Sequence, residues 1–272
     1  MESTTEKFYR LQNILKEMRH IIVAFSGGTD STFLLKVTVD VLGSHVLAVT
    51  ANSEIQPKHE FEEAKNLVQK IGANQLIIHT NEMQDETFIQ NPPNRCYHCK
   101  RSIFSAIKQI ALEKGIPTIV DGSNADDTQD YRPGMRALRE LNIRSPLREA
   151  NLTKSEIRQL SKEMELPTWD QPALACLASR IPYGISITSE KLERIDQAET
   201  YLRNQGIKQV RVRDHDTIAR IEVTEKNNIY FLDKDKTNEI IKHFKDLGYH
   251  YITLDLEGYR TGSLNETIES YG

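Results

Sequence analysis

A glycine-rich hexapeptide directly after a short apolar segment constrains the fold of this chain more than any other feature. The apolar segment is 21–25 (Ile-Ile-Val-Ala-Phe), the hexapeptide is 26–31 (Ser-Gly-Gly-Thr-Asp-Ser), and the stretch after it has a helical pattern. This order predicts a buried strand, a tight turn and a helix start. Glycines let backbone N–H groups approach a ligand, and a helix N-terminus carries partial positive charge. The turn is therefore expected to bind an anion such as a phosphate.

Another interpretation of the hexapeptide is a strand-to-helix turn that is rich in small residues and binds nothing. A Walker P-loop is excluded, because that motif ends in Gly-Lys-Ser/Thr and no such ending follows here. If the turn binds a nucleotide, its candidate cofactor-binding residues are Ser26, Gly27, Gly28, Asp30 and Ser31.

The composition limits the class of protein. A length of 272 residues suffices for one sizeable core and a smaller second one. The formal net charge of −4 argues against non-specific nucleic-acid binding as the main activity. The sequence contains neither an apolar run of membrane-spanning length nor the basic start and apolar core of a signal peptide. The expected compartment is therefore the cytoplasm.

The first half of the chain alternates strand and helix patterns. The expected strands are 20–25, 46–51, 75–80 and 118–121. The expected helices, each followed by a glycine, are 30–42, 59–71 and 100–114. This repetition predicts an α/β fold, a parallel sheet with helices on both faces. Ligands bind at the carboxyl ends of such strands, so we expect three segments to converge there: 26–31, 52–54 (Asn52, Ser53, Glu54) and 121–127.

The rest of the chain follows a different pattern. Residues 81–100 are polar, contain proline and are expected to form a loop over the same sheet edge. Residues 153–156 have a capping-box pattern that predicts a helix to about residue 164. The later expected elements are helix 190–205, strands 210–213 and 219–223, helix 236–247 and strand 251–256. This αββαβ unit predicts a small second domain, 184–272, after a first domain, 1–183.

An acidic loop follows the expected strand 118–121. It contains Asp121, Asn124, Asp126 and Asp127, whose oxygen atoms suit Mg²⁺ bridging to nucleotide phosphates. The alternative is a solvated acidic loop. Lys154, just inside a helix start, is placed to neutralise phosphate charge or else faces solvent.

The chain has three cysteines, an odd number, and a reducing compartment disfavours a structural disulfide. Cys96 and Cys99 form a Cys-x-x-Cys pair, and Cys176 lies far away in the sequence. A zinc site would need a fourth ligand, and a redox pair would leave Cys176 without a role. A [4Fe–4S] cluster held by three cysteines would leave one iron open to an external ligand such as sulfide. Three unrelated thiols are the remaining interpretation.

A further candidate group is basic and comprises Ser179, Arg180, Arg211, Arg213 and Arg220. Arg211 and Arg213 lie two apart on an expected strand, so both side chains point to the same side and suit bidentate phosphate recognition. The alternative is a solvated strand face whose arginines pair with Asp214 and Asp216.

Together these segments resemble the LarE family of ATP-dependent sulfur transferases over nearly the whole chain. The matching segments are 26–31 SGGTDS, 52–54 NSE, 121–127 DGSNADD, 130–134 DYRPG, 152–158 LTKSEIR, 172–184 PALACLASRIPYG and 211–213 RVR. The first segment alone is similar to the pyrophosphate-binding loop of N-type ATP pyrophosphatases in general. The combination with the segment around Cys176 is specific to the family.

The resemblance implies a PP-loop ATP pyrophosphatase domain, a small α+β domain and a two-stage reaction. ATP and Mg²⁺ adenylate a carboxylate of a nicotinate-derived pyridinium biscarboxylic acid mononucleotide and release pyrophosphate. A sulfur nucleophile then displaces AMP, and two rounds give the bisthiocarboxylate precursor of the nickel-pincer cofactor of lactate racemase. Relatives form homo-oligomers through the small domain.

The resemblance also assigns residues. The residues implied to bind ATP are Ser26, Gly27, Gly28, Asp30, Ser31, Asn52, Ser53, Asp121, Asn124 and Lys154. Those implied to bind the substrate phosphate are Ser179, Arg211 and Arg213. Cys176 and Glu199 are implied at the reaction centre as catalytic residues, and Asp30 and Asp127 as Mg²⁺ ligands.

The cysteines determine which branch of the family the chain resembles. In members with one cysteine, the residue matching Cys176 gives up its own sulfur and becomes dehydroalanine. With Cys96 and Cys99 present, this chain resembles the three-cysteine branch, whose matching residues bind a [4Fe–4S] cluster and take sulfur from sulfide or another donor.

Three alternatives remain for the activity. A tRNA-thiolating ATP pyrophosphatase is opposed by the net charge of −4 and by the lack of a recognisable RNA-binding appendage in the sequence. An amide-forming synthetase would leave the cysteines without a role. A nucleotide-binding protein without catalysis comes from a different class, and a pyrophosphate-release assay distinguishes it.

Overall fold

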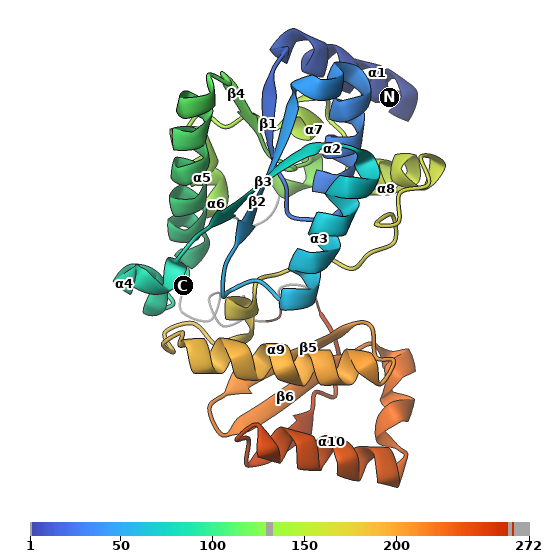
Figure 1. The fold of residues 1–272 in the computed structure, drawn as a ribbon. Helices are drawn as coiled ribbons and strands as arrows, with labels where there is room; N and C mark the ends of the chain where they lie inside the picture. Colours follow the sequence, from blue (N-terminus) through green and yellow to red (C-terminus); the bar gives the residue numbers. More distant parts are fainter. Residues whose placement is uncertain (1, 129–132, 261–262, 264–272) are drawn as a thin grey trace. The chain divides into compact units, whose positions relative to one another are not determined.

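The computed structural model describes residues 2–128, 133–260 and 263. The chain divides into two compact units (Figure 1): the first comprises Met1–Ser53, Lys58–Asn81 and Asn94–Leu174, and the second comprises Glu54–Pro57, Glu82–Pro93 and Ala175–Gly272. The domain boundary expected from the sequence, between residues 183 and 184, remains a prediction. Within the described ranges, the structure has no helix that is both long and apolar enough to cross a membrane.

The first unit is the expected α/β structure. Its parallel strands, in the sheet order β3-β2-β1-β4, are β1 (Ile21–Ala24), β2 (Val46–Asn52), β3 (Asn74–His79) and β4 (Thr118–Val120). Its helices are α1 (Thr4–Met18), α2 (Thr29–Leu42), α3 (Lys58–Ile71), α5 (Arg95–Lys114), α6 (Gly134–Glu140), α7 (Pro146–Glu149) and α8 (Lys154–Glu163), with short 3₁₀ turns η1 (Gly43–His45) and η3 (Ala125–Thr128). The parallel sheet and the α/β class are confirmed.

Helices cover both faces of this sheet, as Figure 1 shows for α2 and α3 on one side and α5 and α6 on the other. The alternation of side chains along β1 explains the two layers. Ile21 and Val23 belong to one buried cluster, with residues of α1, α2, α3 and α8. Ile22 belongs to a second cluster, with Phe104 of α5 and Leu138 of α6. Because β1 and its neighbours are buried on both faces, they read as continuous apolar runs in the sequence.

The strand order places a ligand crevice at one edge of the sheet. From β1 the chain moves to β2 and β3 on one side, and later returns to form β4 on the other side of β1. Connections that leave neighbouring strands in opposite directions open a crevice at their carboxyl ends. The hexapeptide follows β1 and the acidic loop follows β4, so both border this crevice.

The expected loop between residues 81 and 100 is wrong. The segment contains a 3₁₀ turn, η2 (Glu82–Gln84), and a short helix, α4 (Glu86–Ile89), whose N-cap Asp85 accepts hydrogen bonds from two backbone N–H groups. Helix α5 begins at Arg95 rather than Lys100. Its added first turn is stabilised by burial of Tyr97, which is 9% exposed. Packing of one aromatic side chain therefore outweighs the polar composition that suggested a loop.

The second unit has the expected αββαβ order. Its elements are α9 (Ser189–Asn204), β5 (Val210–His215), β6 (Ile218–Val223), α10 (Lys234–Asp246) and β7 (Tyr251–Leu254), with 3₁₀ turns η4 (Leu177–Arg180) and η5 (Glu225–Phe231). Strand β6 pairs antiparallel with β5 and parallel with β7. Val210 and Val212 of β5 join a core with α9 and α10, which leaves Arg211 and Arg213 on the opposite face.

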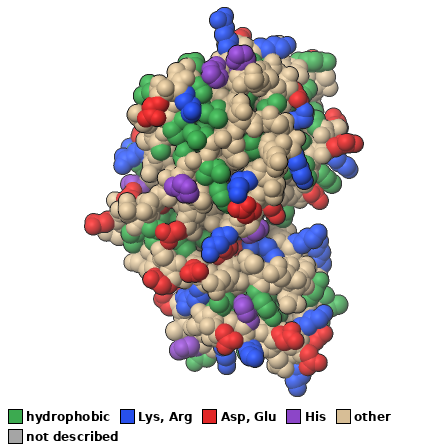
Figure 2. Space-filling model, in the orientation of Figure 1, with side chains coloured by type: hydrophobic (Ala, Val, Ile, Leu, Met, Phe, Trp, Pro, Cys, Tyr) green, Lys and Arg blue, Asp and Glu red, His purple; other side chains and the backbone are tan. Residues whose placement is uncertain are grey.

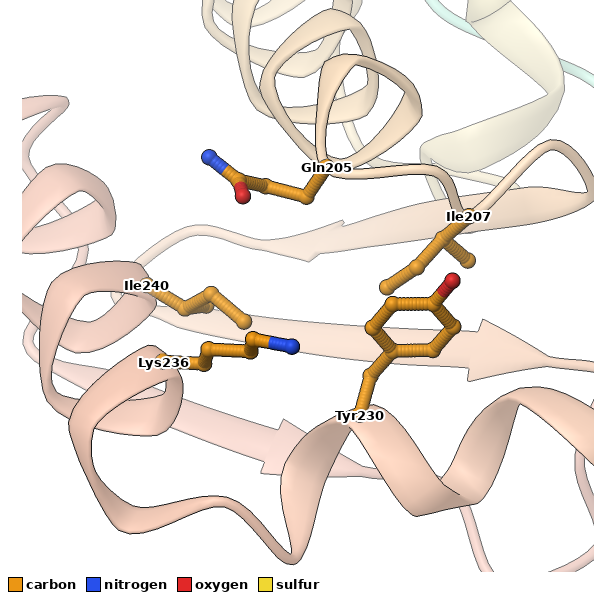
Figure 3. Close-up of a pocket in the computed structure, with 5 residues that line it drawn as sticks. All are labelled: Gln205, Ile207, Tyr230, Lys236 and Ile240. Atoms are coloured by element: carbon orange, nitrogen blue, oxygen red, sulfur yellow. The ribbon is translucent and has the colours of Figure 1, made fainter.

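A small hollow lies at the end of α9 in this unit (Figure 3). Its lining residues are Gln205, Ile207, Tyr230, Lys236 and Ile240. Ile207 and Ile240 belong to the buried core, so the hollow borders that core. None of the residues predicted from the sequence to be functional lines it.

Candidate functional site

The hexapeptide forms a tight turn between β1 and α2. Gly27 has a φ of +80°, and a Cβ on it would lie 2.9 Å from Cβ of Ala64, so only glycine fits. Gly28 is the N-cap of α2, and no described side chain caps this helix start. The N-terminus of a helix in this state attracts an anion through its N–H groups and its dipole. The geometry is that expected of a phosphate-binding turn.

Hydroxyl groups hold the turn in shape. Ser31 donates to the carbonyl oxygen of Gly28 at 3.1 Å, and its Oγ lies 3.1 Å from Oγ of Ser26. Thr29 is 4% exposed and donates to the carbonyl oxygen of Thr168 at 2.8 Å. Ser26 itself is exposed and can contact a ligand.

Asp30 and Lys154 form an ion pair beside this turn. Nζ of Lys154 lies 2.7 Å from Oδ2 of Asp30, and Asn124 donates to the same oxygen at 3.4 Å. Oδ1 of Asp30 is buried and has no hydrogen-bond partner among the described residues. Burial raises the pKa of Asp30 above 3.8, with a further contribution from the charge of Asp127, against the lowering effect of Lys154. A buried carboxylate oxygen without a partner fits a site completed by a cation such as Mg²⁺.

The acidic loop after β4 packs directly on the turn. A Cβ on Gly122 would lie 3.0 Å from the backbone nitrogen of Ser31. Asn124 thereby reaches Asp30, and Lys154 is placed by a hydrogen bond of 2.8 Å from its backbone N–H to Oδ2 of Asp126. The loop therefore positions the ion pair.

The carboxylates of this loop make internal hydrogen bonds. Asp121 accepts from Ser145 at 2.6 Å and from Ser123 at 2.5 Å, and Oδ2 of Asp127 accepts from the backbone of Asn124 at 2.9 Å. Binding of ATP by Asp121 and of Mg²⁺ by Asp127 remain predictions.

Asn52 ends β2, next to β1, and its carbonyl oxygen accepts from the backbone N–H of Thr80 at 3.1 Å. Ser53 follows it at the same carboxyl edge of the sheet. In the segment 130–134, residues Asp130, Tyr131 and Arg132 lie outside the described residues, and Pro133 is the N-cap of α6.

Cys96 and Cys99 lie near the start of α5, three residues apart and therefore on one face of the helix. Cys96 is exposed and Cys99 is partly exposed. Tyr97 between them is buried and donates to Glu140 of α6 at 2.7 Å, which fixes this turn against α6. The pair can supply two ligands to one metal centre. Among the residues with described positions, no group of three or more His, Cys, Asp or Glu side chains is arranged to hold a metal ion.

Cys176 belongs to the second unit, as the N-cap of the 3₁₀ turn η4. Arg180 ends this turn and is fully buried. Its Nη1 donates to the carbonyl oxygens of Ala175 at 2.6 Å and Cys176 at 3.0 Å, and to Oγ of Ser179 at 3.1 Å.

Glu199 is also fully buried, where a surface position would be usual for a lone helical glutamate. It forms a two-pronged ion pair with Arg180, at 2.8 and 2.9 Å, and a second ion pair with Arg203 at 2.6 Å. Burial alone would raise the pKa of Glu199. The charges and hydrogen bonds of the neighbouring arginines outweigh burial and lower the pKa to about 2.

Arg211 and Arg213 share one face of β5, as expected, and are 7% and 6% exposed. The alternative interpretation, in which these arginines pair with Asp214 and Asp216, is wrong. Asp214 pairs with Arg194 and Asp216 with Lys191, because Asp214 points to the other side of the strand.

Glu222 of β6 is the acidic partner that the sequence did not reveal. It is fully buried and accepts from Arg213 at 2.9 and 2.6 Å. It lies directly opposite Arg211 in the strand register. The register of the two antiparallel strands would have placed Glu222 on the same face as the arginines. The sequence does not fix this register, so Glu222 was missed.

Comparisons with known proteins agree with the geometry of the first unit. A family model described as NAD synthase matches residues 5–99. An uncharacterized protein of Synechocystis sp. is 43% identical over 96% of this chain and 98% of its own length. The pyridinium-3,5-bisthiocarboxylic acid mononucleotide synthase of Lactiplantibacillus plantarum is 38% identical over 98% of this chain and 97% of its own length. An uncharacterized protein of Methanocaldococcus jannaschii is 31% identical over 94% of this chain and 98% of its own length.

Proposed function

The chain belongs to the LarE family, that of the pyridinium-3,5-bisthiocarboxylic acid mononucleotide synthases, and from this premise we propose that it is an ATP-dependent sulfur transferase acting on the corresponding biscarboxylic acid mononucleotide. The proposal has ATP cleaved to AMP and pyrophosphate and each substrate carboxylate converted to a thiocarboxylate. The product is the precursor of a nickel-pincer cofactor. The observation that carries the proposal is Asp30, with one oxygen paired to Lys154 and the other buried without a partner at the start of α2.

Adenylation is the first step. A substrate carboxylate oxygen attacks the α-phosphorus of ATP, the bond to the β-phosphate oxygen breaks, and pyrophosphate leaves with the electron pair. The N–H groups at the start of α2 and the ammonium of Lys154 stabilise the negative charge that grows on the phosphate oxygens. Asp30 holds Lys154 in place and would hold Mg²⁺ through its second oxygen, together with Asp127 as the further candidate ligand. Bound Mg²⁺ would supply charge neutralisation for the triphosphate.

Sulfur transfer is the second step. A sulfur nucleophile attacks the carbonyl carbon of the acyl adenylate, the carbon–oxygen bond to AMP breaks, and AMP leaves as a good leaving group. Two rounds give the bisthiocarboxylate.

We assign the sulfur nucleophile to an external sulfide, with Cys96, Cys99 and Cys176 as ligands of a [4Fe–4S] cluster. The arrangement of Cys96 and Cys99 on one helix face fits two such ligands, and Cys176 would be the third. The cluster would supply an open iron site for sulfide. The alternative within the family is Cys176 as a single-turnover donor. There its thiolate would form a thioester, and loss of the α-proton would break its Cβ–S bond and leave dehydroalanine.

The substrate carries a phosphate, and the proposed ligands for it are Ser179, Arg211 and Arg213. The charges around β5 support this assignment, because five arginines (Arg180, Arg203, Arg211, Arg213 and Arg220) lie near only three carboxylates (Glu199, Glu222 and Asp255). The excess positive charge favours an anion there. On the outer surface, by contrast, acidic and basic side chains are interspersed over the face seen in Figure 2, which is no support for tRNA as substrate.

The test of the overall reaction is pyrophosphate release by purified protein with ATP, Mg²⁺ and pyridinium-3,5-biscarboxylic acid mononucleotide. We expect AMP and pyrophosphate in equal amounts, dependent on the mononucleotide, and a mass gain of the product that matches sulfur replacing oxygen. Lack of dependence on the mononucleotide, or thiolation of tRNA instead, would contradict the proposal.

The test of the sulfur source is anaerobic purification followed by iron and labile-sulfide analysis, with the double variant C96S/C99S as comparison. We expect iron and sulfide in the wild-type protein, their loss in the variant, and repeated turnover with added sulfide in the wild type alone. An iron-free wild-type protein in which Cys176 loses the mass of one sulfur during a single turnover would establish the sacrificial alternative.

We further propose a homo-oligomer and a cytoplasmic location, following the family. Sedimentation of the purified protein tests the first, and a monomer at micromolar concentration would contradict it. Cell fractionation tests the second.

A further inference from the structure

We propose that Arg180 and Glu199 are a positioning pair that locks the Cys176 turn to β5 and sets the direction of the Ser179 hydroxyl, and that Glu199 neither touches substrate nor transfers a proton. The inference deepens the proposed function, because it assigns how the turn with Cys176 and Ser179 is held for the reaction. All residues involved belong to the second unit.

Arg180 acts as an internal clamp on the turn. One nitrogen, Nη1, donates to the carbonyl oxygens of Ala175 and Cys176, while Nε and Nη2 donate to Glu199. A guanidinium can do this because its planar fork presents donors in several fixed directions. The backbone on both sides of the peptide bond from Ala175 to Cys176 is thereby held by one buried side chain. Arg180 is fully buried, so it is excluded as a direct phosphate ligand.

The same guanidinium fixes the polarity of Ser179. Arginine has donors and no acceptor, so in the contact of 3.1 Å between Nη1 and Oγ the hydroxyl must accept. The hydroxyl hydrogen of Ser179 then points elsewhere and remains available as a donor. A donor is the group that a phosphate oxygen requires. The carbonyl oxygen of Ser179 is held separately, by Nη1 of Arg213 at 2.8 Å.

Glu199 has its acceptor positions filled by protein groups. Oε1 accepts from Nε of Arg180 at 2.8 Å and from the backbone N–H of Val212 at 3.0 Å, and Oε2 accepts from Arg180 at 2.9 Å and Arg203 at 2.6 Å. Its side chain is 0% exposed. A general base must lie within hydrogen-bond reach of the proton it takes, and no acceptor direction of Glu199 is left for a substrate. The lowered pKa agrees, because a carboxylate with a pKa of about 2 is too weak a base to take a proton effectively at neutral pH.

The bond from Val212 to Glu199 completes the connection. Val212 lies between Arg211 and Arg213 on β5, so the carboxylate fixes the strand that carries both predicted phosphate ligands. Through Arg180 the same carboxylate fixes the turn that carries Cys176 and Ser179. One buried ion pair therefore holds the Cys176 turn and strand β5 in a single arrangement.

The experiment compares the variants R180K and E199Q with R194K as matched control. Arg194 also forms an ion pair with a fully buried carboxylate of this unit, Asp214, and its described hydrogen bonds do not reach the Cys176 turn. The first measurement is the rate at which iodoacetamide labels Cys176 in iron-free protein, read by peptide mass spectrometry with Cys96 and Cys99 as internal references. We expect labelling of Cys176 to rise about tenfold in R180K and E199Q and to stay unchanged in R194K.

Kinetics provide the second measurement. The variants R180K and E199Q are expected to raise KM for the mononucleotide about tenfold while KM for ATP stays unchanged, because the nucleotide turn belongs to the other unit. An E199Q protein with unchanged Cys176 labelling and unchanged KM but a lost chemical step would overturn the inference and identify Glu199 as a proton-transfer group.

If single variants do not fold, the triple variant R180M/E199M/R203M removes Glu199 together with both arginines that pair with it and keeps the volumes similar. It is expected to fold and to label at Cys176 as fast as R180K. Labelling of Cys176 at the wild-type rate would contradict the proposal that Arg180 and Glu199 hold the Cys176 turn in place. Because labelling needs neither substrate nor turnover, it tests the pair even if the proposed sulfur transfer proves wrong.

Discussion

Two ion pairs, Asp30 with Lys154 in the first unit and Glu199 with Arg180 in the second, differ in how many of their hydrogen-bond positions are filled by protein groups. In the first unit, the side chains of Asp30 and Lys154 are 22% and 32% exposed, and one oxygen of Asp30 is buried without a partner among the described residues. In the second unit, Glu199 and Arg180 are both 0% exposed and their polar atoms are bonded on all sides. Burial raises the pKa of Asp30, whereas arginines lower that of Glu199 to about 2.

The difference distinguishes a site from its support. An incompletely bonded buried carboxylate costs stability, and a protein retains it where a ligand completes the bonds. A completely bonded pair has no capacity left for a ligand and serves to hold neighbouring groups. On this criterion we assign Asp30 to the proposed chemistry and Glu199 to the framework, although the resemblance implied both as site residues.

The largest expected effect is on catalysis, from Asp30→Asn. We expect pyrophosphate release to fall roughly a hundred- to a thousandfold, since the neutral amide lacks the charge that attracts Mg²⁺ and Lys154. Stability should be unchanged or higher, because the raised pKa indicates that the site disfavours the charge. Pyrophosphate assays and thermal unfolding measure the two quantities. A marked loss of stability would mean that the pair with Lys154 is structural, and the comparison would fail.

The next effect is on stability, from Glu199→Gln. We expect the free energy of unfolding of the protein to fall by about 3 kcal/mol, because the amide NH₂ would face an arginine donor and leave a buried guanidinium partly unpaired. Urea denaturation measures the change. Glu62→Gln is the matched control, since Glu62 pairs with Lys65 on the surface and should change stability by less than about 0.5 kcal/mol. Equal effects of the two substitutions would contradict the framework role.

The two carboxylates should also give pH dependences of opposite sign. Glu199 has a pKa lowered from 4.5 to about 2, so its contribution is present above pH 4.5 and is lost as pH falls toward about 2, a loss of about 3 kcal/mol. Asp30 has a pKa raised above 3.8, so its contribution is present below 3.8 and is lost as pH rises through the raised pKa. Urea denaturation at a series of pH values should therefore show a smaller loss of stability in acid for E199Q than for wild type. For D30N, the stability should fall less than in wild type as the pH rises above 3.8. Curves parallel to wild type in both variants would refute the assignment.

The smallest effect concerns the helix that carries Lys154. Thr153 caps α8 in a capping box with Glu156, and Thr153→Ala should cost about 1 kcal/mol of stability. Pyrophosphate release should fall only slightly, since the pair of Lys154 with Asp30 persists. Gln159→Ala, on the exposed side of the same helix, is the control and should lie within about 0.5 kcal/mol of wild type. A large loss of activity in T153A would show that the cap, and not Asp30, positions Lys154.

The first unit could be predicted well because its signals are local. Strand, glycine turn and helix are adjacent in the sequence from Ile21 to Leu42, and the capping box at Thr153 involves residues three apart. The start of α5 was missed because Tyr97 is buried against Glu140, which is distant in the sequence. Glu222 was missed because its partner depends on the register of two strands.

By itself the sequence determined the glycine-rich turn between β1 and α2, the parallel sheet behind it and the set of cysteines, since each depends on residue type and short spacing. Only the tertiary structure decided which charged side chains have all their hydrogen-bond positions filled by protein groups. Whether Asp30 keeps an unpartnered oxygen, and whether Glu199 is enclosed by arginines, depends on side chains that folding brings together from distant segments. Burial then sets the free energy of each charge, and burial is a property of the whole fold.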